Sequence, residues 1–217
     1  MAEVDLSETL RRPIMKGIIG ILVFVLCVAA PARADYESAR AAYDRADYET
    51  ALKEFRPLAD QGDPRAQNTF GWMYKQGQGV PQDYSAALKW FRKAADQGLA
   101  KAQINLGLMY YGGMGTDQDY AEAMKWFQKA ADQGDPWGQN NLGEQYKDGK
   151  GVAKDYGEAM AWYRKAADQG LAKAQFSVGL MYEQGLGVSK DDAEALKWYQ
   201  KAADQGLKEA KSKVEAK

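Results

Sequence analysis

The chain has 217 residues, of which 29 are Lys or Arg and 30 are Asp or Glu, so its formal net charge at pH 7 is −1. It contains no His and a single Cys, Cys27. A balanced charge gives no electrostatic footprint for nucleic acid or for a strongly basic membrane surface. The lack of His removes the commonest metal ligand and the side chain best suited to proton transfer near neutral pH.

The first 34 residues are predicted to be a cleavable signal peptide. Gly17–Ala30 is an apolar run of 14 residues that follows Arg11, Arg12 and Lys16 and precedes small residues ending at Ala34. A basic region, a short apolar core and small residues at a cut site are typical of a secretory signal. The run is shorter than the roughly 20 residues of a membrane-spanning helix.

Cleavage after Ala34 would leave residues 35–217, without Cys27 and therefore without thiol or disulfide chemistry. Two alternatives concern the start of the chain. Translation from Met15 would give a more compact signal, and Arg11–Met15 loosely resembles a twin-arginine export signal. The predicted localisation is periplasmic, with secretion as the alternative.

The tetrapeptide ADQG occurs five times, and each copy lies 36 residues after the last. A fixed period in this range is typical of a solenoid, in which no unit buries its apolar face alone. The spacing divides the chain into a capping hairpin at 35–61, four units at 62–97, 98–133, 134–169 and 170–205, and a C-terminal capping helix at 206–217.

Each unit is predicted to form two helices, as the second unit illustrates. Its first helix spans about Ala100–Tyr111, and Ala102, Leu106 and Tyr110 share one face because they lie four residues apart. Its second helix opens at Asp119 and carries an apolar stripe. Four tryptophans recur at one position of this second helix and are interpreted as core or inter-repeat packing: Trp90, Trp126, Trp162 and Trp198.

The ends of these helices carry capping signals. Asp119 and Glu122 have the spacing of a capping box, in which the Asp accepts a backbone N–H bond and the Glu reaches back to the Asp N–H. Two later units repeat the pair, whereas Asp83 is followed by Ala86 and lacks the second half. Gly98, the glycine of one ADQG copy, is expected to close the preceding helix in the left-handed conformation. ADQG is therefore interpreted as a helix-ending sequence between stacked hairpins.

These features resemble the Sel-one-like repeat, a relative of the tetratricopeptide repeat. The residues of the second unit that carry the resemblance are Leu106-Gly107, Tyr110, Gly113-Met114-Gly115, Asp119-Tyr120, Ala123, Trp126-Phe127 and Ala130-Ala131. The other units carry the same framework, with Thr116, Gly138 and Asp192 as departures. The resemblance implies an all-α, right-handed α-solenoid of stacked helix-turn-helix repeats.

One side of the first helix differs between units, and by resemblance to tetratricopeptide arrays it should line a concave groove. Aromatic and aliphatic side chains lie there among Lys, Arg and Asn, which suggests a groove for a peptide or helix of an acidic partner. The predicted groove residues are Arg65, Asn68, Trp72, Lys75, Lys101, Ile104, Leu108, Tyr111, Trp137, Asn140, Lys173, Phe176 and Leu180. The alternative is that several of these side chains pack against neighbouring helices.

The sequence predicts a non-enzymatic adaptor or scaffold in the bacterial cell envelope, with no cofactor and no nucleic-acid partner. Its partner would be a protein or peptide segment, such as part of a membrane-bound complex or sensor. One alternative is a secreted factor that binds host surface proteins. Another is a carboxylate-dependent hydrolase of cell-wall or antibiotic substrates, although no serine begins a catalytic motif and the Gly-x-Gly loops do not continue as phosphate loops.

Overall fold

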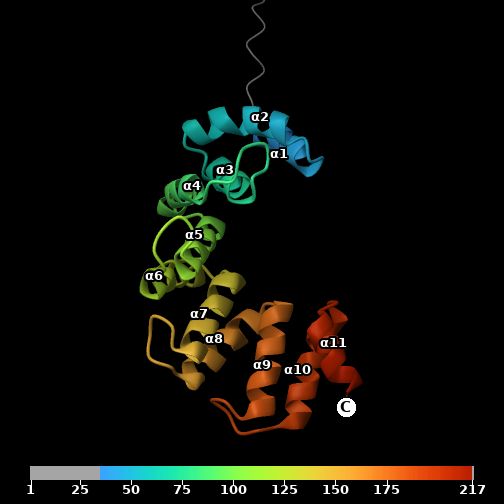
Figure 1. Ribbon diagram of the computed structural model, residues 1–217. Helices are drawn as coiled ribbons and strands as arrows, with labels where there is room; N and C mark the ends of the chain where they lie inside the picture. Colours follow the sequence, from blue (N-terminus) through green and yellow to red (C-terminus); the bar gives the residue numbers. More distant parts are fainter. Residues whose placement is uncertain (1–34, 217) are drawn as a thin grey trace, which may run out of the picture. The chain divides into compact units, whose positions relative to one another are not determined.

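The structure is a computed structural model that describes residues 35–216, and all regular structure in this range is helical (Figure 1). The helices are α1 (Tyr36–Asp44), α2 (Tyr48–Asp60), α3 (Pro64–Gln76), α4 (Tyr84–Asp96), α5 (Ala100–Gly112), α6 (Tyr120–Asp132), α7 (Pro136–Asp148), α8 (Tyr156–Asp168), α9 (Ala172–Gln184), α10 (Asp192–Asp204) and α11 (Lys208–Glu215). The predicted signal peptide, residues 1–34, lies outside the described residues.

Helices that follow one another in the chain pack against each other along its whole described length. The first and second helices of one repeat meet most extensively, as α3 meets α4 and α5 meets α6, and each pair then packs on the next. The first helices α5 and α7 also touch. The prediction of an all-α solenoid of stacked helix-turn-helix repeats is confirmed. None of the helices in residues 35–216 is long and apolar enough to cross a membrane.

The ADQG glycines end the second helices as predicted. Gly98 has φ +88°, a left-handed conformation that glycine adopts at least steric cost. Its N–H donates to the Ala95 carbonyl over 3.0 Å, and the Leu99 N–H donates to the Ala94 carbonyl over 3.3 Å. This pair of bonds is a Schellman motif, which satisfies carbonyls at the end of the helix.

The glutamine of ADQG has a structural role that the sequence pattern does not predict. Gln97 donates from Nε2 to Oε1 of the buried Gln67 over 2.8 Å, and Gln67 donates to the Ala59 carbonyl at the end of the preceding repeat. The same amide pair recurs as Gln133–Gln103, Gln169–Gln139 and Gln205–Gln175. A buried amide in each first helix is thus hydrogen-bonded, as burial of a polar group requires.

The expected capping box is only half correct. Asp119 accepts a hydrogen bond from the Glu122 N–H over 2.9 Å, but its own N–H donates to the Tyr110 carbonyl at the end of α5. Because that N–H already has an acceptor, the Glu122 carboxylate does not bind it. Its two oxygens accept from Trp126 Nε1 and from Lys125 Nζ, each over 3.0 Å.

The tryptophan prediction is confirmed by burial. Trp126 is 3% exposed and packs with Ala87 and Phe91 of the preceding repeat, and Trp198 is 8% exposed. A lysine three residues later lies over each of the four indole rings, at 3.8–4.0 Å from the centroid. The indoles therefore seal the contact between repeats, and the lysines cover their outer faces.

The Gly-x-Gly loops are turns, as expected, but their second glycine is also a contact between repeats. Gly115 has φ +73° and lies against the backbone of Tyr84, at the start of the preceding second helix. A Cβ at this position would lie 2.5 Å from the Tyr84 carbonyl oxygen, closer than real contacts allow. The loop can therefore dock on the preceding repeat only if glycine stands there.

Candidate partner-binding surface

We define the variable face as the thirteen first-helix residues that the sequence predicts to line a groove. The structure divides them by exposure. Arg65, Lys101, Trp137 and Lys173 are exposed. Seven are partly buried: Asn68, Trp72, Lys75, Leu108, Tyr111, Phe176 and Leu180.

The other two members, Ile104 and Asn140, are buried, which corrects the prediction that they line a groove. Ile104 is 9% exposed and packs in one cluster with Phe127 and Leu142. Asn140 has no exposed surface, and its Nδ2 donates to Glu144 over 3.3 Å. The helical step places both on the variable side, but neighbouring helices cover that side at these two positions.

Polar bonds join adjacent first helices along the variable face. Asn105 of α5 donates to Asn68 of α3 over 2.9 Å. Lys173 of α9, which was expected to orient an acidic partner, forms an ion pair of 2.8 Å with Glu144 of α7. The charge of Lys173 is therefore balanced within the chain. Arg65 of α3 is also paired, with Asp63 over 3.3 Å and with Glu37 over 4.0 Å, but it stays exposed. Within residues 35–216, Lys75 of α3 and Lys101 of α5 form no ion pair.

Three predicted residues meet around one hollow of about 450 Å³. Arg65 and Asn68 come from α3 and Lys101 from α5, and Gln133 and Asp135 also line the hollow. A guanidinium, an ammonium and a side-chain amide are donors that suit a carboxylate.

Aromatic rings lie beside the cations in this part of the variable face. The Arg65 guanidinium lies 4.2 Å from the centre of the Tyr36 ring and 3.3 Å from the Asp63 carboxylate. Farther along α3, the Lys75 ammonium lies 5.0 Å from the centre of the Trp72 ring, and burial lowers the pKa of Lys75. The rings hold both cations by cation–π attraction while leaving the Arg65 side chain exposed.

Trp137 supplies a large exposed apolar group at the start of α7. It is 48% exposed, and its backbone N–H donates to the Asp135 carboxylate that caps the helix. The other large hydrophobic residue of comparable exposure in residues 35–216 is Tyr84, at 38% on the second helix α4. Trp137 lies two residues after Asp135, which lines the hollow described above.

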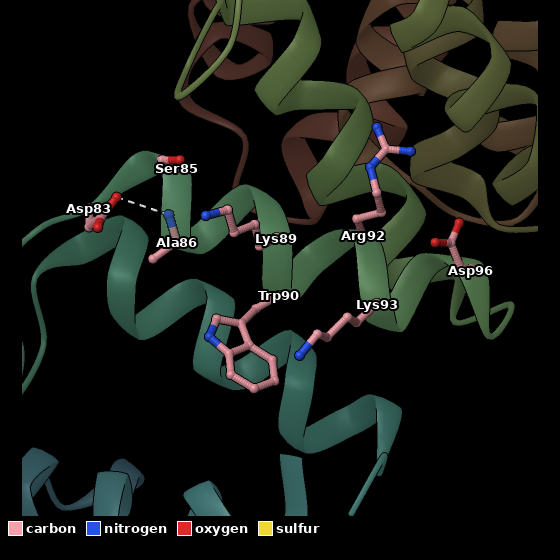
Figure 2. A pocket seen from close by; sticks show the side chains of 8 residues that line it. All are labelled: Asp83, Ser85, Ala86, Lys89, Trp90, Arg92, Lys93 and Asp96. Carbon is pink, nitrogen blue, oxygen red and sulfur yellow. Dashed lines mark hydrogen bonds between the residues drawn. The ribbon is translucent and has the colours of Figure 1, made fainter. Parts of the chain in front are cut away.

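A second hollow, of about 470 Å³, lies along α4, and Figure 2 shows the side chains around it. Its lining residues are Asp83, Ser85, Ala86, Lys89, Trp90, Arg92, Lys93 and Asp96. We call it the α4 hollow. None of the residues predicted from the sequence to bind a partner lines the α4 hollow. The signal that could have found it is the departure at Ala86, where all three later units carry Glu.

A family model described as the Sel1 repeat matches residues 64–99, 100–135, 138–171 and 172–207, which together make up more than half of the chain. The chain belongs to the Sel1 repeat family. The resemblance seen in the sequence is therefore confirmed, and the matched segments begin two to four residues after the units divided at ADQG.

Solved structures share the fold of this Sel1 repeat chain. A Sel1 repeat protein from Oxalobacter formigenes is 40% identical, with a TM-score of 0.79 over 83% of this chain and 74% of that chain. A protective antigen of uropathogenic Escherichia coli with an SLR fold is also 40% identical, with a TM-score of 0.73 over 82% of this chain but only 41% of its own. An immunity protein from Pseudomonas aeruginosa is 25% identical, with a TM-score of 0.57 over 80% of this chain and 68% of that chain. A comparison with curated proteins finds no match.

Within residues 35–216, no group of three or more Cys, Asp or Glu side chains is placed to hold a metal ion. Several acidic side chains of the Sel1 repeats serve helix caps and ion pairs, as Asp83 and Glu122 illustrate. Hydrogen-bond donors and aromatic rings lie on the first helices and around α4.

Proposed function

We propose that this Sel1 repeat protein is a non-enzymatic adaptor that binds an acidic segment of a partner protein on the variable face. Proteins of the family generally serve as protein–protein interaction scaffolds. The observation that carries the proposal is the meeting of Arg65, Asn68 and Lys101 around one hollow. Donors from two consecutive repeats converge there, so the site exists only in the stacked array.

Aromatic and cationic residues of the variable face would have different roles in binding. The exposed Trp137 indole is the kind of rigid aromatic group that anchors an interface. Arg65 and Lys101 would attract carboxylates and set the orientation of the segment, because charge complementarity governs specificity and association rate more than affinity.

The proposal includes export to the periplasm, which rests on the signal-like sequence of residues 1–34. The partner would then be a segment of a membrane-bound envelope complex or sensor. Cell fractionation followed by N-terminal sequencing tests this part. A mature chain that begins at Asp35 in the periplasm supports it, the same chain in culture fluid supports a secreted factor, and an unprocessed cytoplasmic chain refutes export.

The binding surface is tested by cross-linking the tagged full chain in the native envelope and identifying what it captures. One bait carries Arg65→Glu with Lys101→Glu, and another carries Trp137→Ala. The matched control is Tyr84→Ala, which removes an aromatic group of similar exposure from a second helix. Circular dichroism checks that helix content is unchanged.

A partner that is captured by the wild type and the control, but lost from both variable-face baits, supports the proposal. If all four baits capture the same proteins, the variable face is not the binding surface. If the wild type captures no protein at all, the adaptor function is refuted.

A further inference from the structure

The second helices of the second and fourth repeats each hold one of their own carboxylates in the same way. In α6, Glu122 accepts hydrogen bonds from Trp126 Nε1 over 3.0 Å and from Lys125 Nζ over 3.0 Å. In α10, Glu194 accepts from Trp198 Nε1 over 3.1 Å and from Lys197 Nζ over 2.9 Å. In both helices, one oxygen takes the indole N–H and the other takes the ammonium.

The first repeat has the two donors of this arrangement without the acceptor. Lys89 and Trp90 stand where the lysine and tryptophan of the other two repeats stand, but Ala86 replaces the glutamate. Among residues 35–216, no acceptor is hydrogen-bonded to Trp90 Nε1 and no carboxylate pairs with Lys89. The α4 hollow lies at this point of the helix.

The third repeat shows that a glutamate alone is not enough. It keeps Glu158 and Trp162 but has Ala161 in place of the lysine. Glu158 is exposed, and no hydrogen bond joins it to Trp162 within the described residues. The glutamate is therefore hydrogen-bonded to the indole in the two repeats whose lysine ammonium binds its second oxygen.

Four other charged groups line the α4 hollow, and one of them, the Asp96 carboxylate, forms no ion pair with Lys89 within residues 35–216. Asp83 is occupied as the helix cap, since its Oδ1 accepts the Ala86 N–H over 2.9 Å. Arg92 is hydrogen-bonded to the Tyr110 hydroxyl, and Lys93 lies over the Trp90 ring. In Figure 2 the indole nitrogen lies on the edge of the ring away from Lys93, and Lys89 extends toward the turn that carries Ala86.

We propose that the α4 hollow binds the carboxylate of a Glu or Asp side chain from a partner protein, in place of the glutamate that the first repeat lacks. One oxygen would accept from Trp90 Nε1 and the other from Lys89 Nζ, as the Glu122 oxygens do in α6. The hollow of about 470 Å³ is open and larger than a carboxylate, so it leaves room for the chain that presents it. A single exposed ion pair contributes little affinity, and a protein segment supplies the remaining contacts that a free small acid lacks.

The test follows the indole N–H signals of the full chain by nitrogen–proton NMR. The chain has six tryptophans, and Trp90→Phe identifies the signal of Trp90. The probe is a nine-residue peptide, blocked at both ends, with a central Glu, and the matched probe carries Gln there. We expect the Glu peptide to shift the Trp90 signal and the Gln peptide to leave it unchanged.

Two variants make the test specific to the missing glutamate. Ala86→Glu should move the Trp90 signal without any peptide and weaken binding of the Glu peptide at least about tenfold, because the added carboxylate occupies both donors. Glu122→Ala should give the second repeat the same vacancy, so that the Trp126 signal responds to the Glu peptide. Ala161→Glu, which adds one negative charge on α8, is the control and should leave the Trp90 response unchanged.

The proposal is overturned if millimolar Glu peptide leaves the Trp90 signal in place, or if Ala86→Glu binds the peptide as the wild type does. Acetate that shifts the signal as strongly as the peptide, at equal concentration, would overturn the assignment to a protein segment. Because the α4 hollow and the variable face share no residue, these results do not depend on the captures that test the proposed function.

Discussion

The second helices of the first and second repeats, α4 and α6, have the same length and the same framework but differ in what their tryptophan contacts. Both have 13 residues and follow an aspartate cap. In α6, Trp126 is 3% exposed and bonded to Glu122. In α4, Trp90 is partly buried and Ala86 stands in place of the glutamate. The framework determines where the indole lies, and one variable residue decides whether its N–H is satisfied within the chain.

The largest loss of stability is expected when the buried phenylalanine that both helices contain is removed. Phe91 of α4 and Phe127 of α6 are at most 1% exposed, and each ring packs against a glycine of its first helix, Gly71 or Gly107. Phe91→Ala and Phe127→Ala should each lower the free energy of unfolding by about 3–5 kcal/mol, because each leaves a cavity that the backbone cannot fill. Chemical denaturation measures both, and a cost in one helix below half of that in the other would contradict a common framework.

A smaller effect tests whether the caps are also equivalent. Asp83 and Asp119 each accept one backbone N–H bond at the start of their helix, over 2.9 Å. Asp83→Ala and Asp119→Ala should each cost about 1 kcal/mol, the usual loss for an N-cap. Asp→Asn at the same positions should keep most of the stability, since the amide oxygen can also accept the bond. A larger loss for Asn than for Ala would show that the caps act in another way.

The helices should differ once the glutamate position is changed. Glu122→Ala should lower the free energy of unfolding by about 1 kcal/mol, since it removes two hydrogen bonds to a partly buried carboxylate. Ala86→Glu should raise it by about 0.5 kcal/mol, because the new carboxylate can accept hydrogen bonds from the Trp90 indole and the Lys89 ammonium. Thermal and chemical denaturation measure both changes. Equal and opposite shifts are not required, but destabilisation by Ala86→Glu would refute the similarity of the two sites.

The elements of the fold could be predicted from the sequence because their signals are local. The glycine of ADQG and the aspartate before α6 each act within one turn of a helix end, and the 36-residue period can be read directly from the sequence. The bond between Gln97 and Gln67 joins residues 30 apart, and only packing shows that both amides are brought together. Glu122 was assigned to the wrong donor because the Tyr110 carbonyl, which satisfies the cap N–H, reaches it from the preceding helix.

The candidate sites were harder to predict, for a related reason. The helical step selects the variable side of a first helix, but it does not show which positions the next repeat covers, and so Ile104 and Asn140 were misplaced. The α4 hollow depends on an absent side chain. The sequence shows that position 86 lacks Glu. Only the structure shows that the Glu122 carboxylate accepts from the Trp126 indole, and hence that the Trp90 indole lacks this acceptor.

The smallest expected effect is a dependence of stability on pH, caused by Glu194 of the fourth repeat. A hydrogen bond from the Lys197 ammonium, with its charge and the Trp198 indole N–H, lowers the pKa of Glu194. Because the folded pKa lies below the unfolded value of about 4.3, this carboxylate stabilises the fold above that pH. Its contribution is lost as the pH falls through the folded pKa, and at this partly exposed site we expect less than about 1 kcal/mol.

Glu194→Gln should therefore show a smaller loss of stability between pH 7 and pH 3 than the wild type. Denaturation at the two pH values and carbon NMR of the carboxyl group measure the effect. The Ala86→Glu chain, compared in the same way, should lose more stability in acid than the wild type, since the first repeat would gain a carboxylate held by Lys89 and Trp90. If the new carboxyl titrates at its ordinary value, the donors of the α4 hollow do not hold a carboxylate as those of α10 do.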